Sequence, residues 1–167
     1  QHCVFVSVPP KRFYGQFGNS VDAGFRQVLQ ENSPRLAATV EAAALCGRLR
    51  GFGGIPGYLR QSWGPGWALV GDAGYFKDPL TAHGITDALR DAEALALAVL
   101  AGTDAALERY QEERDARSLP LFEVTDKIAS FVWSLDEIKQ HHLDLNAAMK
   151  AELEDAAGQS QHPSLAA

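Results

Sequence analysis

The amino-acid sequence predicts a mixed fold, α+β or α/β, with a few N-terminal strands, a central Gly-Asp motif and a largely helical C-terminal half. Three observations predict this class. Residues that favour β structure dominate positions 2–8, and a short apolar run at positions 67–70 ends in Gly71-Asp72. From residue 84 onward, apolar residues recur at three- and four-residue steps, as in amphipathic helices. With 167 residues, 46% of them hydrophobic, the chain can bury a core.

Composition and charge exclude several classes of function. The net charge of −6 disfavours a nucleic-acid partner, because phosphate backbones bind Lys- and Arg-rich surfaces. The sequence contains no apolar run long enough for a membrane span, and its first residues are not a signal peptide. Cys3 and Cys46 form no Cys-x-x-Cys pair. Two such thiols suit a cytoplasmic protein, although sequence alone leaves a disulfide open.

The first segment, residues 1–65, begins with a predicted strand at positions 2–8 that ends at Pro9-Pro10. This strand needs partner strands, because a single extended segment cannot satisfy its own backbone hydrogen bonds. Residues 11–18 are basic and aromatic and contain two glycines, which predicts a loop.

Two helices are expected next. Asn19 or Ser20 can cap the first, whose apolar side carries Phe25. Ser33-Pro34 starts the second in the usual way, with a capping residue followed by proline in the first turn. The second helix is expected to stop near Gly47.

A glycine-rich stretch at residues 51–57 invites comparison with the Gly-x-Gly-x-x-Gly dinucleotide fingerprint. The sixth position of that pattern is Pro56, and the residues that follow leave no room for a helix before the next strand. Without a helix N-terminus the loop has no cradle for a pyrophosphate, so we reject the comparison and expect a strand or crossover segment.

The segment at residues 66–102 is the most informative part of the sequence. The run Trp67-Ala68-Leu69-Val70 suits a buried strand, Gly71-Asp72 interrupts it, and a loop with Pro79 follows. Thr81 to Ile85 then leads into a helix. The free N–H groups of its first turn and its dipole favour a polar or anionic ligand. One face of this helix is apolar and carries Ile85, Leu89, Ala92, Leu95, Ala96 and Val99.

This segment resembles the second flavin-binding motif of the FAD-dependent aromatic hydroxylases, the p-hydroxybenzoate hydroxylase-like flavoprotein monooxygenases. The matching elements are Gly71-Asp72, Pro79, Ala82, Gly84 and Asp91-Ala92, in register over some twenty positions. His83 is a departure, because many relatives have Gln there. The position is expected to contribute its backbone N–H. The alternative interpretation is a surface loop entering an amphipathic helix, with Asp72 as a turn former.

The resemblance implies a role for each residue of the motif. Asp72 accepts a hydrogen bond from a ribityl hydroxyl of FAD, and the N–H groups of His83, Gly84 and Ile85 face the pyrimidine edge of the flavin ring. A helix N-terminus there favours reduced flavin, which carries negative charge near N1. Gly84 allows close approach of the ring, and Pro79 fixes the loop near the reactive edge. The expected FAD-binding residues are Gly71, Asp72, Pro79, Thr81, Ala82, His83, Gly84 and Ile85.

Two further residues have open interpretations. Relatives can place an Arg upstream of their Gly-Asp, so Arg60 either contacts a pyridine-nucleotide phosphate or is a surface Arg in solvent. His83 could shuttle protons near a flavin, although its structural role in the motif is the favoured interpretation. Adjacent His141-His142 with Asp144 point about 100° apart on a helix, so we expect no metal site. We expect no catalytic side chain, because the chemistry belongs to the flavin.

Residues 103–157 predict C-terminal helices. Thr103-Asp104 caps the first, whose Tyr110 and Arg114 match a Tyr-x-x-x-Arg spacing common in the family. Pro120 is expected to end that helix and separate it from the next. Ser134 and Glu137 form a capping box for a last helix. Residues 158–167 are expected to be a flexible tail.

The resemblance predicts the C-terminal portion of a longer flavoenzyme. The fingerprint that holds the ADP half of FAD does not occur in this chain, which alone should bind FAD weakly. In the full enzyme, NAD(P)H would reduce FAD and a small organic substrate would be hydroxylated. Flavin-dependent halogenases and isoprenoid reductases are alternatives within the family. A non-catalytic helical interaction module is the alternative outside it.

Overall fold

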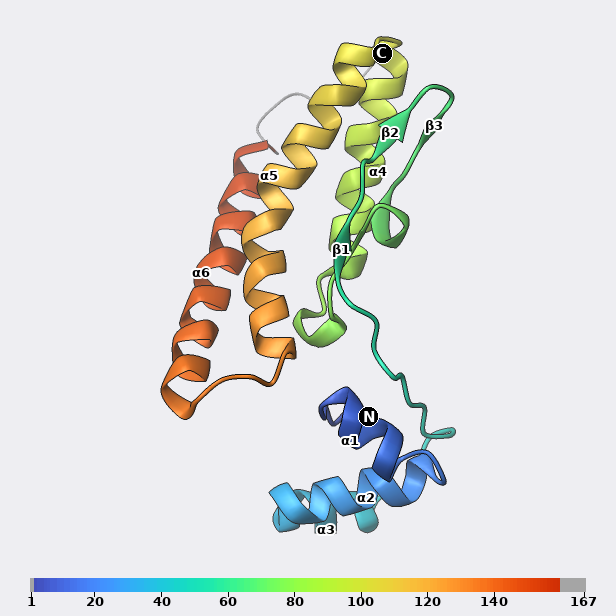
Figure 1. Ribbon diagram of the computed structural model, residues 1–167, viewed down its shortest axis with the longest axis vertical. Coiled ribbons are helices and arrows are strands. Elements are labelled where there is room, and N and C mark those ends of the chain that lie inside the picture. The colour runs from blue at the N-terminus through green and yellow to red at the C-terminus, as the bar shows by residue number, and fades with distance from the viewer. Residues whose placement is uncertain (1, 160–167) are drawn as a thin grey trace. The chain divides into compact units, whose positions relative to one another are not determined.

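The computed structural model describes residues 2–159, which are mostly helical with four short antiparallel strands (Figure 1). This confirms the mixed α+β class. The chain divides into two compact units between Ile55 and Pro56. The strands lie in the second unit, between Tyr58 and Phe76, so the prediction of N-terminal strands is wrong.

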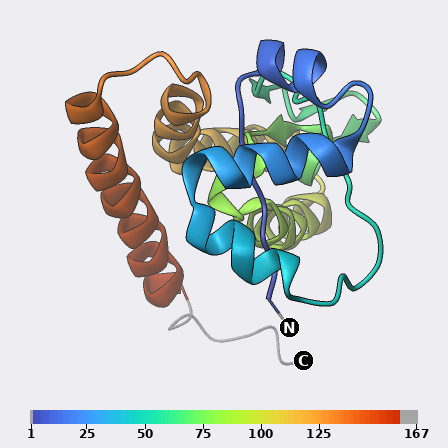
Figure 2. The same ribbon diagram turned by 90° about the horizontal axis from the view of Figure 1, so that it is seen from below.

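The first unit contains three helices: α1 (Pro10–Gln16), α2 (Val21–Asn32) and α3 (Pro34–Glu41). Ser20 caps α2 and Ser33 caps α3, as the sequence predicts. Helices α2 and α3 pack against each other (Figure 2). The core of this unit consists of Phe17, Phe25, Val28 and Leu29.

Two predictions for the N-terminal residues are wrong. Within the described stretch 2–9 no strand forms, because no neighbouring strand completes a ladder. Val4, Val6 and Val8 instead pack on the core of the first unit. The expected loop at 11–18 is mostly helix α1, which Pro10 starts from its first helical position.

The strands of the second unit form two small antiparallel pairs. Strand β1 (Tyr58–Leu59) pairs with β4 (Tyr75–Phe76), and β2 (Trp63–Gly64) forms a hairpin with β3 (Trp67–Ala68). Only the first two residues of the apolar run 67–70 therefore form a strand. The run is not buried either, since Trp67 and Val70 are both exposed. Two 3-10 turns follow, η1 (Gly71–Ala73) and η2 (Pro79–Thr81).

Three long helices complete the second unit: α4 (Gly84–Ala101), α5 (Asp104–Ala129) and α6 (Leu135–Gln159). Helix α5 contacts both α4 and α6, and Figure 1 shows α5 running between them. Thr103 caps α5, and Ser134 and Glu137 form the predicted capping box at the start of α6. The predicted tail begins within the last turn of α6, and its residues 160–167 lie outside the described residues.

Pro120 does not end a helix, contrary to the sequence-based expectation. Helix α5 is 26 residues long and contains Pro120 in its interior. Proline removes one backbone hydrogen bond, the one to the carbonyl of Ala116. Close packing on either side compensates for this loss, because Leu121 and Thr125 are completely buried.

Helix α4 is amphipathic, and its apolar face is turned to solvent. Ile85 is 80% exposed and Leu89 70% exposed, and Val99 is exposed as well. The face that packs inward carries Asp87, Asp91 and Ala98. Two carboxylates thus lie where apolar side chains are usual, and the elements that precede α4 supply their partners.

Candidate functional site

The Asp72 side chain lies beside the N-terminus of α4. A Cβ atom built on Gly84 would be 3.8 Å from Asp72 Oδ1, and apart from its chain neighbours and the nearby backbone of α4 no other described atom would lie within 4 Å of it. Asp72 and Gly84 are both exposed. The structure therefore places the exposed Asp72 carboxylate next to the first turn of α4.

The N-terminus of α4 has no side-chain capping hydrogen bond among the described residues. The first N–H groups of an α-helix lack intrahelical partners, so those at the start of α4 are available to a ligand or to water. A carboxylate close to a helix N-terminus also gains from the helix dipole. Asp72 therefore stabilises the start of α4 whether or not a ligand binds.

The turn before α4 has a constrained backbone. Asp78 accepts a hydrogen bond from the Leu80 N–H at 3.0 Å, which fixes the 3-10 turn containing Pro79. Ala82 follows with φ of 56°, a left-handed conformation that costs an L-residue about 1 kcal/mol. Thr81 is buried and Pro79 is exposed. These residues set the direction in which α4 begins.

Gly71 and Asp91, two residues of the matched motif, have structural roles. Gly71 has φ of 57°, and a Cβ there would lie 2.9 Å from the Ala88 Cβ of α4. The Gly71 backbone N–H donates a hydrogen bond to the Asp91 carboxylate. These two contacts of Gly71 join the η1 turn to the inner face of α4 and so hold Asp72 near the helix N-terminus.

Burial raises the pKa of the Asp91 carboxyl above its ordinary value, and the hydrogen bond from Gly71 acts in the opposite direction. The folded chain therefore binds this proton more tightly than the unfolded chain does. Stability falls as pH rises from the ordinary Asp range to the raised pKa and is level above it. Asp91→Asn is expected to raise the free energy of unfolding at pH 7, with a smaller gain at pH 4.

Urea denaturation at the two pH values measures this effect. Asp136→Asn, which changes an exposed carboxylate on α6, is the control and should cost under about 1 kcal/mol at pH 7, with no gain in stability. A loss of stability in Asp91→Asn at pH 7 would contradict the assignment.

Helix α5 holds the strands and turns that precede α4. Tyr110 donates to the Leu69 carbonyl oxygen at 2.8 Å, and burial raises the pKa of Tyr110 to about 12, so it remains a donor. Gln111 Oε1 accepts from the Ser62 N–H at 2.7 Å. The buried Arg114 donates to the Arg60 carbonyl oxygen at 2.6 Å. Arg114 also donates to the Gly74 carbonyl oxygen at 3.4 Å. Tyr110 and Arg114 therefore hold the backbone just before and just after Gly71-Asp72.

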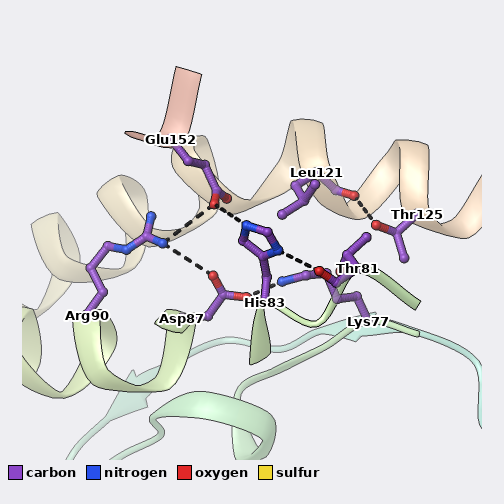
Figure 3. Close-up of polar contacts among 8 residues, drawn as sticks. All are labelled: Lys77, Thr81, His83, Asp87, Arg90, Leu121, Thr125 and Glu152. Carbon is purple, nitrogen blue, oxygen red and sulfur yellow. Dashed lines mark hydrogen bonds and ion pairs between the residues drawn. The ribbon is translucent and has the colours of Figure 1, made fainter. Parts of the chain in front are cut away.

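A charged network under the start of α4 was missed by sequence reasoning (Figure 3). Lys77 pairs with Asp87, and both side chains are nearly inaccessible. Arg90 Nη2 lies 3.4 Å from Asp87 Oδ1 and 3.6 Å from Glu152 Oε2 of α6. His83 Nε2 is 4.0 Å from that same oxygen. The only available sequence signal was the position of Asp87 and Asp91 one turn apart, which also fits an exposed face.

Arg60 is exposed, and none of the ion pairs among residues 2–159 includes it. Its guanidinium stacks 4.1 Å from the centre of the Tyr58 ring, and its Nη1 donates to the Ala73 carbonyl oxygen at 3.0 Å. Tyr58 in turn donates to the Asp72 carbonyl oxygen at 2.7 Å. An exposed cation therefore sits on the same surface as the predicted flavin residues.

Of the expected flavin residues, the structure brings Asp72 and Gly84 together, and not every side chain of the set is exposed. Asp72, Ala82, Gly84 and Ile85 are exposed, whereas Gly71 and Thr81 are buried. An open groove of about 420 Å³ lies elsewhere, on α2 and α3 of the first unit, where Leu29, Ala37 and Val40 line it.

Within residues 2–159, no cluster of His, Cys, Asp or Glu could hold a metal ion. None of the described helices combines the length and apolarity that crossing a bilayer requires. No known protein family, curated protein or solved structure matches the chain. The flavin resemblance therefore stays a prediction.

Proposed function

We propose that the second unit contributes the ribityl and ring contacts of an FAD site in an NAD(P)H-dependent oxidoreductase of the monooxygenase type. One observation carries the proposal: the Asp72 carboxylate lies beside the uncapped start of α4, at a glycine whose missing side chain leaves open space. Both features suit a ligand that has hydroxyls and a flat acceptor edge.

The residues present fit this half of FAD. Asp72 would accept a hydrogen bond from a ribityl hydroxyl, and a carboxylate makes the stronger, charge-assisted kind. The N–H groups of Gly84 and Ile85 would face the pyrimidine edge of the ring. The bound flavin would supply hydride acceptance and oxygen chemistry, and the chain would position it and favour its reduced form through the helix N-terminus.

The ADP half of FAD requires contacts that the described residues do not offer. We propose that a further polypeptide segment, the expected N-terminal part of the same enzyme, supplies them and covers the apolar face of α4. NAD(P)H and a small organic substrate would complete the reaction in the cytoplasm. Halogenation and isoprenoid reduction remain alternative reactions for the same flavin site.

Flavin titration tests the proposal on the chain itself. Quenching of FAD fluorescence should report weak binding, and Asp72→Ala should weaken it about tenfold, as expected for loss of one charge-assisted hydrogen bond. Asp136→Ala is the charge-matched control, because Asp136 is fully solvated on α6. Equal affinities for the wild type and Asp72→Ala would refute the proposed site.

A second candidate function is a non-catalytic interaction module. The exposed apolar face of α4 favours it, since a helix normally turns this face toward a partner. On this alternative the loop from Gly71 to Gly84 only connects elements. Ile85→Ser and Leu89→Ser together would then abolish partner binding, Asp72→Ala would leave partner binding unchanged, and the wild-type chain would bind no FAD.

A further inference from the structure

Residues 2–8 form no backbone hydrogen bond with any other described residue. Among the described residues, the first backbone hydrogen bonds along the chain are those that the Pro9 carbonyl oxygen accepts at the start of α1. Each of these peptide groups carries a donor and an acceptor, which the described chain leaves to water or to a partner. Such a row of unpaired groups is what a free strand edge offers to another strand.

The side chains of this segment alternate as they do in an extended strand. Val4, Val6 and Val8 are half-buried and pack on the core of the first unit, whereas Phe5 and Ser7 are exposed. A period of two places successive side chains on opposite faces, so the core already holds the segment in a form suited to pairing. The feature that the segment lacks is therefore the neighbouring strand.

A second copy of the same segment is a suitable neighbour. Residues 3–8 contain no charged side chain, so two copies can lie side by side without like-charge repulsion. An antiparallel arrangement centred on Phe5 pairs all seven residues, with Val4 opposite Val6 and the two Phe5 rings opposite each other. This register keeps the valines of both copies on one face of the pair and gives the exposed Phe5 an aromatic partner on the other. Pro9 has no N–H and ends the pairing.

We propose that residues 2–8 of two copies of the chain pair as antiparallel strands about a two-fold axis at Phe5. The interface is isologous, so the same residues meet from both sides and the assembly closes at two copies. One pair of short strands is a small interface, which predicts a weak dimer with a dissociation constant on the order of 100 µM. The pairing is independent of the proposed flavin site, because the expected flavin residues all lie in the second unit.

Sedimentation equilibrium of the whole chain in reducing buffer tests the pairing. The wild type should change from monomer to dimer between about 10 µM and about 1 mM. Phe5→Lys and Phe5→Glu should each lower the association constant about tenfold, because each removes the aromatic pair and sets like charges opposite each other. An equimolar mixture of the two variants should associate again, since opposite charges then meet. Phe5 is 70% exposed, so neither substitution disturbs the core of the first unit.

Leu135→Lys is the matched control, because it changes a similarly exposed apolar residue of α6 and should dimerise like the wild type. Hydrogen exchange of the wild type gives a second readout, in which alternate amides of residues 2–8 become protected as the dimer forms. A chain that stays monomeric at about 1 mM, a dimer that Phe5→Lys leaves intact, or a mixture of the two variants that does not associate would each overturn the proposal. Assemblies larger than a dimer would overturn it as well, because pairing through both strand edges does not close.

Discussion

Lys77→Met is expected to lower the free energy of unfolding of the second unit by about 3 kcal/mol, the largest stability effect predicted for this chain. The substitution leaves Asp87 buried, with only Arg90 at 3.4 Å to compensate its charge. Removing one member of a buried pair costs more than the pair contributes, because the remaining charge stays desolvated. Urea denaturation followed by circular dichroism measures the change.

Two variants control this result. Lys139→Met breaks an exposed pair with Asp136 and should cost under about 1 kcal/mol. The double variant Lys77→Met/Asp87→Leu removes both buried charges and should recover most of the lost stability. Equal effects of Lys77→Met and Lys139→Met would show that the buried pair does not hold α4 against the preceding turn.

Gly84→Ala should weaken FAD binding by at least about tenfold while changing the free energy of unfolding by under about 0.5 kcal/mol. The fold has room for the methyl group, because the nearest described atom, Asp72 Oδ1, would lie at 3.8 Å. A flavin ring stacked against the backbone would not have that room. Parallel fluorescence titration and urea denaturation separate the two effects.

Gly71→Ala is the opposite case within the same motif. Its positive φ and the 2.9 Å approach to Ala88 Cβ predict a loss of about 2 kcal/mol in stability. If Gly84→Ala lost as much stability as Gly71→Ala, or kept full flavin affinity, Gly84 would be a structural glycine rather than a binding one.

Local signals in the sequence predicted where four helices start, although not where α3 ends. Ser20, Ser33, Thr103 and Ser134 each cap the helix they were expected to cap. Capping is decided by residues within one turn of each other, so sequence contains the needed information. The same locality explains why the turn at Gly71-Asp72 and the start of α4 were found.

Features that depend on distant partners were not predictable in this way. Positions 2–8 favour a strand locally, but they form none because no partner strand lies alongside. Pro120 breaks isolated helices, yet packing around Leu121 carries α5 through it. Asp87 and Asp91 are typical surface residues whose burial depends on Lys77 and on the Gly71 backbone.

In the candidate site, too, features set by local sequence were predicted and contacts between distant residues were not. Asp72 and Gly84 were predicted from the motif, and the structure brings them together. The contacts of Glu152 with His83 and Arg90 were not foreseeable, because Glu152 lies more than 60 residues further along the chain and nothing in its local pattern sets it apart from the other acidic residues of α6.

The most direct measurement is an amide NMR titration of the ¹⁵N-labelled chain with FAD. The largest chemical-shift changes are expected on the N–H groups of His83, Gly84 and Ile85, and Asp72→Ala should need about ten times more FAD to produce them. Shifts that cluster in the groove on α2 and α3, or no shifts at millimolar FAD, would contradict the proposed site.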